Sequence, residues 1–150
     1  MTNPIPSKIS IAEFQQIITE ELPWAASLNI SVDKIKSGEV IMRLPYHQDS
    51  VRPGGTISGP HMMLLADACM YAVVLSLLGP VKLAVTTNLN INFLRKPRES
   101  DLLAEGRIIK LGKRLAVLDV SIHSESEEKL VAHATGTYSI PPHEPVLSAE

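Results

Sequence analysis

The sequence predicts an α+β domain in which one long central helix is wrapped by a curled antiparallel sheet of about six strands. Residues 62–78 are apolar on nearly every face and contain a single carboxylate, Asp67, whereas a helix at a protein surface shows only an apolar stripe. The chain on either side alternates apolar and polar residues, as half-buried strands do. A helix that is apolar all round must be surrounded, and strands joined by short turns can surround it as a curled antiparallel sheet.

The length of the chain predicts a single domain. Its 150 residues, 45% of them hydrophobic, can form one substantial core and are too few to divide comfortably into two. We expect the core at about residues 28–140, preceded by a short helix and followed by a polar, proline-containing tail from residue 141.

The first two predicted elements are a short amphipathic helix and a hairpin. The helix covers residues 10–22, because the sequence SIAE from Ser10 to Glu13 has the form of a capping box and apolar residues follow it at helical spacing until Pro23, which is expected to end the helix. Apolar and polar residues then alternate through residues 28–44 on both sides of a turn at Gly38, which predicts a β-hairpin.

A loop leads into the long central helix. Residues 46–57 are polar and contain glycine, as loops do. Pro60 suits the first turn of a helix and Gly79 the position just past its end. The N-cap is therefore expected at Ser58 or Gly59.

After Gly79 the period of the pattern changes to two, and strands dominate the rest of the chain. Turns at Lys96-Pro97, at Gly112 and near Ser124 separate the alternating segments. The predicted strands are residues 88–93, 102–111, 115–122 and 130–140.

The composition argues against several classes of protein. A net charge of -2 and a pI near 6.2 provide no global basic field for nucleic acid or an anionic membrane. Residues 62–78 are shorter than the ~20 apolar residues of a membrane span and contain Asp67. One cysteine, Cys69, allows no intrachain disulfide and no signal sequence opens the chain, so we expect a cytoplasmic protein. The histidines show no metal-ligand spacing, and we expect no metal.

Three short motifs and the order of elements resemble a known family. Gly55-x-x-Ser58-Gly59-Pro60 enters the central helix, Leu65-Ala66-Asp67 follows within it, and residues 90–97, NINFLRKP, lie in the next strand. Over roughly residues 28–140 the chain resembles the hotdog-fold acyl-CoA thioesterases of the PaaI type (4-hydroxybenzoyl-CoA thioesterase-like). The resemblance implies the hotdog fold, hydrolysis of an acyl-CoA substrate, no cofactor beyond the CoA of that substrate, and a homodimer or a dimer of dimers.

Asp67 and Gly59 are the main catalytic candidates. Thioester hydrolysis needs a carboxylate that activates water or attacks the carbonyl, and donors for the developing oxyanion. Asp67, weakly solvated among apolar residues, suits the general base or nucleophile. The helix N-terminus offers free N–H groups, and since Pro60 has none, Gly59 is the expected oxyanion donor. The alternative is that Asp67 only pairs with a polar loop or a buried arginine and stabilises the fold.

Tyr71 and Met63 are weaker candidates. Tyr71 lies one helical turn after Asp67, where its hydroxyl could bind the water or the thioester, or its ring could narrow the acyl pocket. Met63, with Met62 and Met70, could line an adaptable acyl pocket or simply pack in the core. Only six aromatic residues are present, so no aromatic-rich pocket is evident and aliphatic acyl groups are weakly favoured.

The chain departs from the family where the central helix begins. Many members enter this helix through His-Gly-Gly, but Ser58 replaces the His and Pro60 the second Gly. Ser58 could contact substrate or act only as the N-cap, and His61 is expected to act at the helix end rather than replace the missing His. Arg52 stands near the position of the loop Asn or Gln found in many members.

Polar and basic residues in the second half are candidates for binding CoA. Arginine and lysine commonly meet phosphates, and two basic groups, one along a strand end and one at a hairpin turn, could meet the nucleotide phosphates. With the loop arginine and two asparagines of the strand that resembles the family, the candidates are Arg52, Asn88, Asn90, Arg95, Lys96, Arg98, Lys110, Lys113 and Arg114.

Two rival functions remain on the same fold. One is a non-catalytic acyl-CoA-binding protein like the hotdog regulators of lipid synthesis, which carry a DNA-binding segment for which the 27 residues before Leu28 leave little room. The other is an enoyl-CoA hydratase-type enzyme, whose relatives use an Asp and His motif that is absent from this sequence. Hydrolysis is therefore the leading function.

The spacing of the two main candidates predicts a shared site. Gly59 and Asp67 are eight residues apart, which is about 12 Å along an α-helix at ~1.5 Å per residue. Donor and base must each come within ~3 Å of one thioester. We therefore expect the site between the subunits of a two-fold homodimer, with Gly59 of one chain facing Asp67 of the other.

Overall fold

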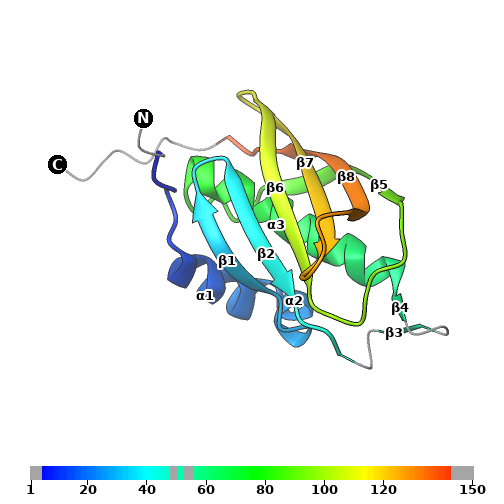
Figure 1. Ribbon diagram of the computed structural model, residues 1–150. Helices are drawn as coiled ribbons and strands as arrows, with labels where there is room; N and C mark the ends of the chain where they lie inside the picture. The colour runs from blue at the N-terminus through cyan, green and yellow to red at the C-terminus, as the bar shows by residue number, and fades with distance from the viewer. Residues whose placement is uncertain (1–4, 48–50, 53–55, 143–150) are drawn as a thin grey trace.

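A six-stranded antiparallel sheet curls around one long helix, α3 (Gly59–Leu78), which confirms the predicted arrangement (Figure 1). The computed structural model describes residues 5–47, 51–52 and 56–142, the side chains of 51, 52 and 56 excepted. The strand order is β1-β2-β6-β7-β8-β5. The strands are β1 (Ser31–Lys36), β2 (Glu39–Leu44), β5 (Val85–Phe93), β6 (Leu102–Leu111), β7 (Leu115–Ser124) and β8 (Leu130–Ser139).

The N-terminal helix is present, and a second helix follows it. In α1 (Ile11–Glu21) the Ser10 side chain accepts from the N–H of Glu13 and the Glu13 carboxylate accepts from the N–H of Ser10, so the predicted capping box is confirmed. Pro23 opens α2 (Pro23–Ser27) instead of only ending α1, because proline is favoured at the first position of a helix.

Three boundaries differ from those predicted. The first strand starts at Ser31 rather than near residue 28, because Asn29 has a φ of 58° and makes a turn. The loop before α3 contains a small separate pair of strands, β3 (Val51–Arg52) and β4 (Thr56–Ile57). The strand after α3 begins at Val85, three residues earlier than its alternation indicated; an irregularity between Thr86 and Asn88 interrupts the period of two there.

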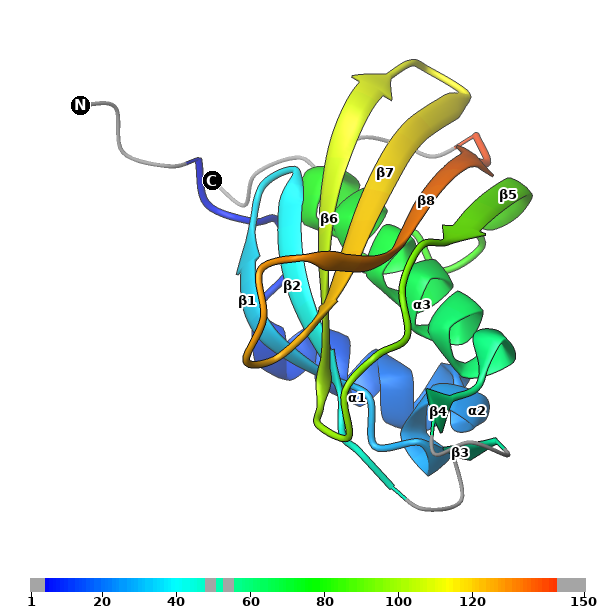
Figure 2. The same ribbon diagram turned by 45° about the vertical axis from the view of Figure 1, so that its right-hand side comes forward.

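The central helix begins and ends as predicted. Pro60 lies in the first turn, and Gly79, with a φ of 86°, stands at the C-terminal end. Among the described residues, α3 alone has the length and hydropathy of a membrane span. Figure 2 shows the sheet curling over one side of it, and its middle is buried from Ala68 to Ser76. It is therefore a core helix of the fold.

Two glycines let the sheet approach α3 closely. A Cβ at Gly106 of β6 would lie 2.7 Å from Cys69 Sγ, and one at Gly136 of β8 would lie 2.5 Å from Met70 Sδ and 3.0 Å from the carbonyl oxygen of Asn88. All three distances are shorter than van der Waals contact. Small residues are therefore required where these strands cross the helix.

We expect Gly136→Ala to lower the free energy of unfolding by about 1–3 kcal/mol, the usual cost of overpacking a core. Met70 can rotate away from the added methyl group, but the Asn88 carbonyl belongs to the neighbouring strand and cannot. Urea denaturation would measure the change. Thr135→Ala, at an exposed neighbouring position, is the control and should stay within ~0.5 kcal/mol of wild type. Equal stability of all three proteins would contradict this account of the helix–sheet contact.

The two faces of the sheet have different environments. Residues such as Leu118 and Ala134 pack toward α3, whereas their neighbours face away from it. Asn88 and Asn90 pair with Thr137 and Thr135, and cross-strand partners share a face, so both asparagines lie on the face opposite α3. β5 ends the sheet, and one of its edges has no strand beside it in the described part of the chain.

Candidate active site

Asp67 is held by two hydroxyl groups from distant strands. Its Oδ1 accepts a hydrogen bond from Thr86 Oγ1 at 2.6 Å and another from Tyr138 OH at 2.7 Å, and the Tyr138 hydroxyl also lies 3.1 Å from the Asp67 carbonyl oxygen. No described residue donates to Oδ2. The side chain is partly exposed. Asp67 is therefore a hydrogen-bonded carboxylate with one open oxygen, and not the buried, unpaired group that the apolar segment suggested.

Asp67 lies beside a cavity of about 390 Å³ whose walls come from four parts of the chain. Leu22 and Trp24 line it from the α1–α2 junction, together with Tyr71 on α3 and Tyr138 on β8. Three of the six aromatic residues of the chain thus gather at one cavity. The low aromatic content was a poor guide to the pocket, because the fold concentrates these rings beside the carboxylate.

The Tyr71 hydroxyl points away from Asp67. It donates to the backbone carbonyl of Lys82 at 3.0 Å, while the ring packs between Phe14 and Tyr138, with centroids 5.9 and 6.3 Å away. Burial raises the pKa of Tyr71, and burial together with the nearby Asp67 raises the pKa of Tyr138. Both tyrosines stay protonated donors near neutral pH. Of the two roles considered for Tyr71, this placement favours the wall of the pocket.

Gly59 belongs to a second, separate hollow. It is the first residue of α3, so its N–H has no acceptor within the helix. The hollow beside it has a volume of about 720 Å³ and includes Phe93, Arg95 and Lys96 at the end of β5. A Cβ at Gly59 would lie 3.2 Å from the Phe93 ring, which explains the glycine. Asp67 does not line this hollow and Gly59 does not line the other.

The residues at the start of α3 bond to each other. Ser58 is the N-cap, as expected, but its side chain makes no cap hydrogen bond; its hydroxyl is paired with Nδ1 of His61 instead. His61 thus acts at the helix end, as expected. Met62 lines the Gly59 hollow, Met63 is 41% exposed outside both hollows, and Met70 is buried in the core.

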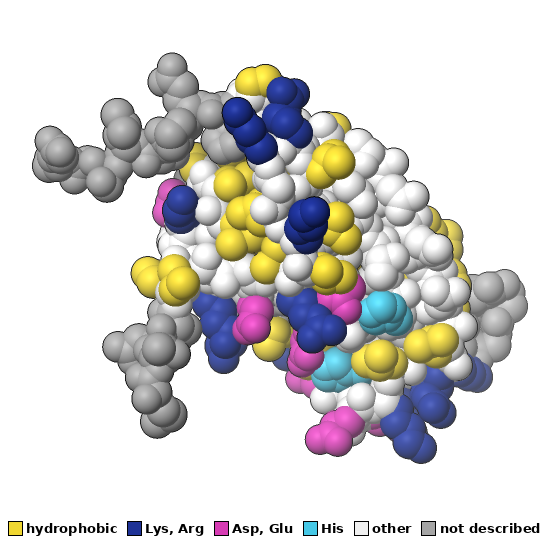
Figure 3. All heavy atoms as spheres, turned by 90° about the horizontal axis from the view of Figure 1, so that it is seen from above, with side chains coloured by type: hydrophobic (Ala, Val, Ile, Leu, Met, Phe, Trp, Pro, Cys, Tyr) yellow, Lys and Arg dark blue, Asp and Glu magenta, His cyan; other side chains and the backbone are white. Residues whose placement is uncertain are grey.

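The basic candidates divide into two groups at opposite ends of the sheet. Arg95 and Lys96 line the Gly59 hollow. Arg98 is paired with Glu127 through Nε at 2.7 Å and lines a neighbouring hollow. The other group lies at the turn between β6 and β7. Figure 3, which views the molecule from above, shows Lys and Arg side chains among hydrophobic ones on that face. This second group consists of Lys110, Lys113 and Arg114, and the side chain of Arg52 lies outside the described residues.

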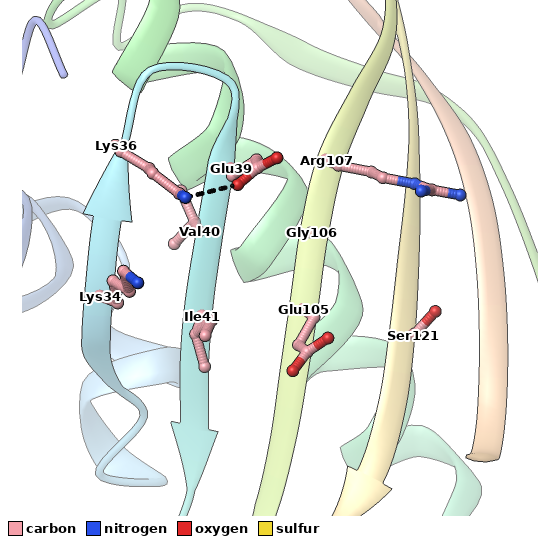
Figure 4. A pocket seen from close by; sticks show the side chains of 9 residues that line it. All are labelled: Lys34, Lys36, Glu39, Val40, Ile41, Glu105, Gly106, Arg107 and Ser121. Carbon is pink, nitrogen blue, oxygen red and sulfur yellow. Dashed lines mark ion pairs between the residues drawn. The ribbon is translucent and has the colours of Figure 1, made fainter. Parts of the chain in front are cut away.

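A further hollow, of about 360 Å³, lies on the sheet face away from α3 (Figure 4). Its charged side chains are largely paired: Lys36 with Glu39 at 3.0 Å, and Arg107 with Asp119 at 2.8 Å. Burial opposes ionisation of Asp119, but hydrogen bonds from Arg107 and His133 outweigh it and hold its pKa below its usual range. This network stabilises the outer face and is separate from the Asp67 cavity.

Comparison with known proteins identifies the family. The model described as the thioesterase superfamily matches residues 54–131, which include Gly59, Asp67 and Thr86. The chain belongs to this superfamily. The resemblance seen in the sequence is thereby confirmed: the protein is a hotdog-fold thioesterase by family, and a hydrolase.

Relatives of this thioesterase cover most of its length. The candidate esterase SSO1253 of Saccharolobus solfataricus is 31% identical over 133 residues, which are 88% of this chain and 86% of the relative. The structure of a candidate thioesterase from Silicibacter sp. TM1040 is 42% identical, with a TM-score of 0.83 over 93% of this chain and 97% of that one. A mutant of the phenylacetic acid degradation protein PaaI from Thermus thermophilus is 26% identical, with a TM-score of 0.69 over 78% and 97%.

Thr86, Tyr138 and Trp24 are the site residues that sequence reasoning missed. Thr86 and Tyr138 lie 19 and 71 residues from Asp67, and no spacing rule joins a helix residue to strands at such distances. Trp24 follows the proline that was expected to end the first helix. No local pattern in the sequence connects these three residues to Asp67.

Proposed function

We propose that this thioesterase hydrolyses an acyl-CoA thioester to the free acid and CoA, with Asp67 as general base or nucleophile and the Gly59 N–H as oxyanion donor. The observation that carries the proposal is the open oxygen of Asp67 beside a cavity lined by aromatic and aliphatic side chains as well as polar ones. Carboxylates placed in this way are suited to proton transfer or to attack on a carbonyl.

Two chemical routes fit the proposed site. As a base, Asp67 takes a proton from water, the hydroxide oxygen attacks the thioester carbon, and the C–S bond breaks while the proton passes to the leaving thiolate. As a nucleophile, Asp67 attacks the carbon itself, the C–S bond breaks and CoA leaves as the thiolate. Water then hydrolyses the mixed anhydride to the free acid and restores Asp67, and the proton released from that water neutralises the thiolate. In both routes negative charge develops on the carbonyl oxygen, which the Gly59 N–H would stabilise together with the positive end of the α3 dipole.

The proposed active form is a two-fold homodimer, alone or as a dimer of dimers. One edge of β5 is available for pairing, and an unpaired edge strand is a template for another strand. Val85, Phe93 and Leu94 on or next to this strand are exposed apolar residues, between 50% and 57% accessible. Pairing β5 with its copy would bury them. It would also bring the Gly59 hollow of one chain to the Asp67 cavity of its partner.

The acyl group is assigned to the cavity beside Asp67. Its rings, Trp24, Tyr71 and Tyr138, favour a flat aromatic acyl group or a short aliphatic one. The similarity to PaaI, which is named as a phenylacetic acid degradation protein, supports this choice. The volume of about 390 Å³ leaves little room for a long chain.

A thiol-release assay over acyl-CoA chain lengths and aryl-CoAs tests the function. We expect release of CoA, fastest with a compact or aromatic acyl group. Saturable binding of the same esters without any release would indicate the non-catalytic binding protein instead. Addition of water to an enoyl-CoA, followed by its absorbance, would indicate the hydratase-type enzyme.

Replacing Arg95 and Lys96 together by Ala should raise KM for CoA esters and leave short pantetheine thioesters, which lack the nucleotide, nearly unaffected. These two side chains line the Gly59 hollow, and phosphate contacts remote from the reacting bond contribute mainly to binding. Steady-state kinetics with both substrates measures the difference. The matched control is Arg98→Ala, because Arg98 does not line the Gly59 hollow and should change KM less. An equal loss for both substrates would assign Arg95 and Lys96 to folding.

A further inference from the structure

The two hydroxyl groups on Asp67 come from residues that face each other across the sheet. Thr86 of β5 pairs directly with Tyr138 of β8, and both side chains point toward α3, where they reach the same oxygen of Asp67. An oxygen that accepts two short hydrogen bonds has little capacity left for another donor. The remaining oxygen, Oδ2, receives no hydrogen bond from any described residue.

A β-bulge is what turns Thr86 toward the helix. Between the pairs Thr86–Tyr138 and Asn88–Thr137, β5 contains one extra residue, Thr87. Because side chains alternate along a strand, Thr86 would otherwise share the outer face with Asn88. The extra residue reverses the alternation and places Thr86 on the inner face. Bulges commonly re-aim a side chain in this manner next to active sites.

We infer that Thr86 and Tyr138 are positioning residues, which hold Asp67 by Oδ1 so that Oδ2 is the oxygen that acts in catalysis. The inference rests on the proposed role of Asp67. Each hydroxyl donates to the ionised carboxylate and favours that form, and together they fix the side chain in one orientation. Tyr138 is suited to this task because burial keeps its hydroxyl protonated.

Other ionisable groups around the cavity must be considered in any pH measurement. They are Glu21 at the end of α1, Tyr71 on α3 and Lys82 in the α3–β5 connection. Glu21 and Lys82 form an ion pair at 3.4 Å and are each about half exposed. None of the three donates to the Asp67 carboxylate. Changes at Thr86 or Tyr138 therefore leave these groups with their present partners.

The test is the pH dependence of kcat/KM for Tyr138→Phe and Thr86→Val. Because each hydroxyl donates to the carboxylate, loss of a donor should move the acid limb of the profile to higher pH. At pH values above this limb, a remaining loss of roughly 10-fold in kcat would report the lost orientation. The double variant should show the larger effect on both measurements.

Three further variants make the result decisive. Tyr46→Phe and Thr135→Val make the same chemical changes away from both hollows and should leave the profile unchanged. Tyr71→Phe removes a cavity hydroxyl that bonds to Lys82, so it should alter KM without moving the acid limb. If Asp67→Asn is inactive but Tyr138→Phe and Thr86→Val, both folded by circular dichroism, keep the wild-type limb and plateau, the positioning role is wrong. If Asp67→Asn is fully active, the proposed function of Asp67 is wrong as well.

Discussion

We expect Asp67→Asn to lower kcat by at least ~100-fold, the usual scale for loss of a general base or nucleophile. The fold should survive, because the amide oxygen of Asn can still accept from Thr86 and Tyr138, and the change removes a charge from a partly buried position. Stopped-flow and steady-state assays of thiol release would measure kcat, and circular dichroism would confirm folding. Asp67→Ala should likewise abolish hydrolysis while the affinity for acyl-CoA survives.

The matched control for this charge removal is Asp119→Asn on the outer face. Asp119 is also a buried carboxylate with two partners, Arg107 and His133, but it lies on the face of the sheet away from α3 and does not line the cavity. The kcat of Asp119→Asn should match wild type. Near-normal turnover of Asp67→Asn would remove Asp67 from the mechanism.

Asp119 also contributes to the pH dependence of stability. Because folding lowers the pKa of Asp119, its charge stabilises the protein above the unfolded pKa of about 3.9, and this contribution is lost as pH falls through the lower folded pKa.

Mixing two inactive variants, Gly59→Pro and Asp67→Ala, should restore about a quarter of wild-type activity. In a two-fold dimer with shared sites, random exchange makes half of the dimers mixed, and each mixed dimer has one of its two sites intact. Gly59→Pro removes the proposed donor at the first helical position, where proline is tolerated. Thiol release after co-refolding or co-expression measures the recovery.

The mixing experiment needs two checks. Each parent must be folded and dimeric by itself, since a proline beside the Phe93 ring requires that ring to move by a few tenths of an ångström. Mixed dimers must be demonstrated directly, for example with two different affinity tags. If mixed dimers are present and remain as inactive as their parents, Gly59 and Asp67 do not meet across an interface. The oxyanion donor must then be sought elsewhere.

The core of the fold could be predicted because its signals are local and periodic. Apolar residues on every side of one helix require an enclosing sheet, and a period of two over successive segments specifies the strands. The capping box at Ser10 and the signals at Pro60 and Gly79 also act within a few residues. Predicted boundaries were wrong where the same local sequence is compatible with two structures. Pro23, for example, can end one helix or begin the next.

The catalytic candidate was visible in the sequence, but its environment was not. A single carboxylate in an apolar helix is conspicuous, and Asp67 was identified on that basis together with the family resemblance. Its partners depend on strand pairing. Strict alternation back from Asn88, Asn90 and Asn92 would place Thr86 on the outer face, but the bulge at Thr87 turns it inward.

The sequence by itself determined the buried helix, the alternating strands, the turns between them and the isolated carboxylate, because each of these depends only on residues that are close together in the sequence. Only the tertiary structure decided which groups meet Asp67, which rings form the cavity, and that Gly59 opens on a different hollow. These features depend on the register and curvature of strands up to 71 residues away. Register follows from how the whole sheet closes around α3, and no local pattern contains that information.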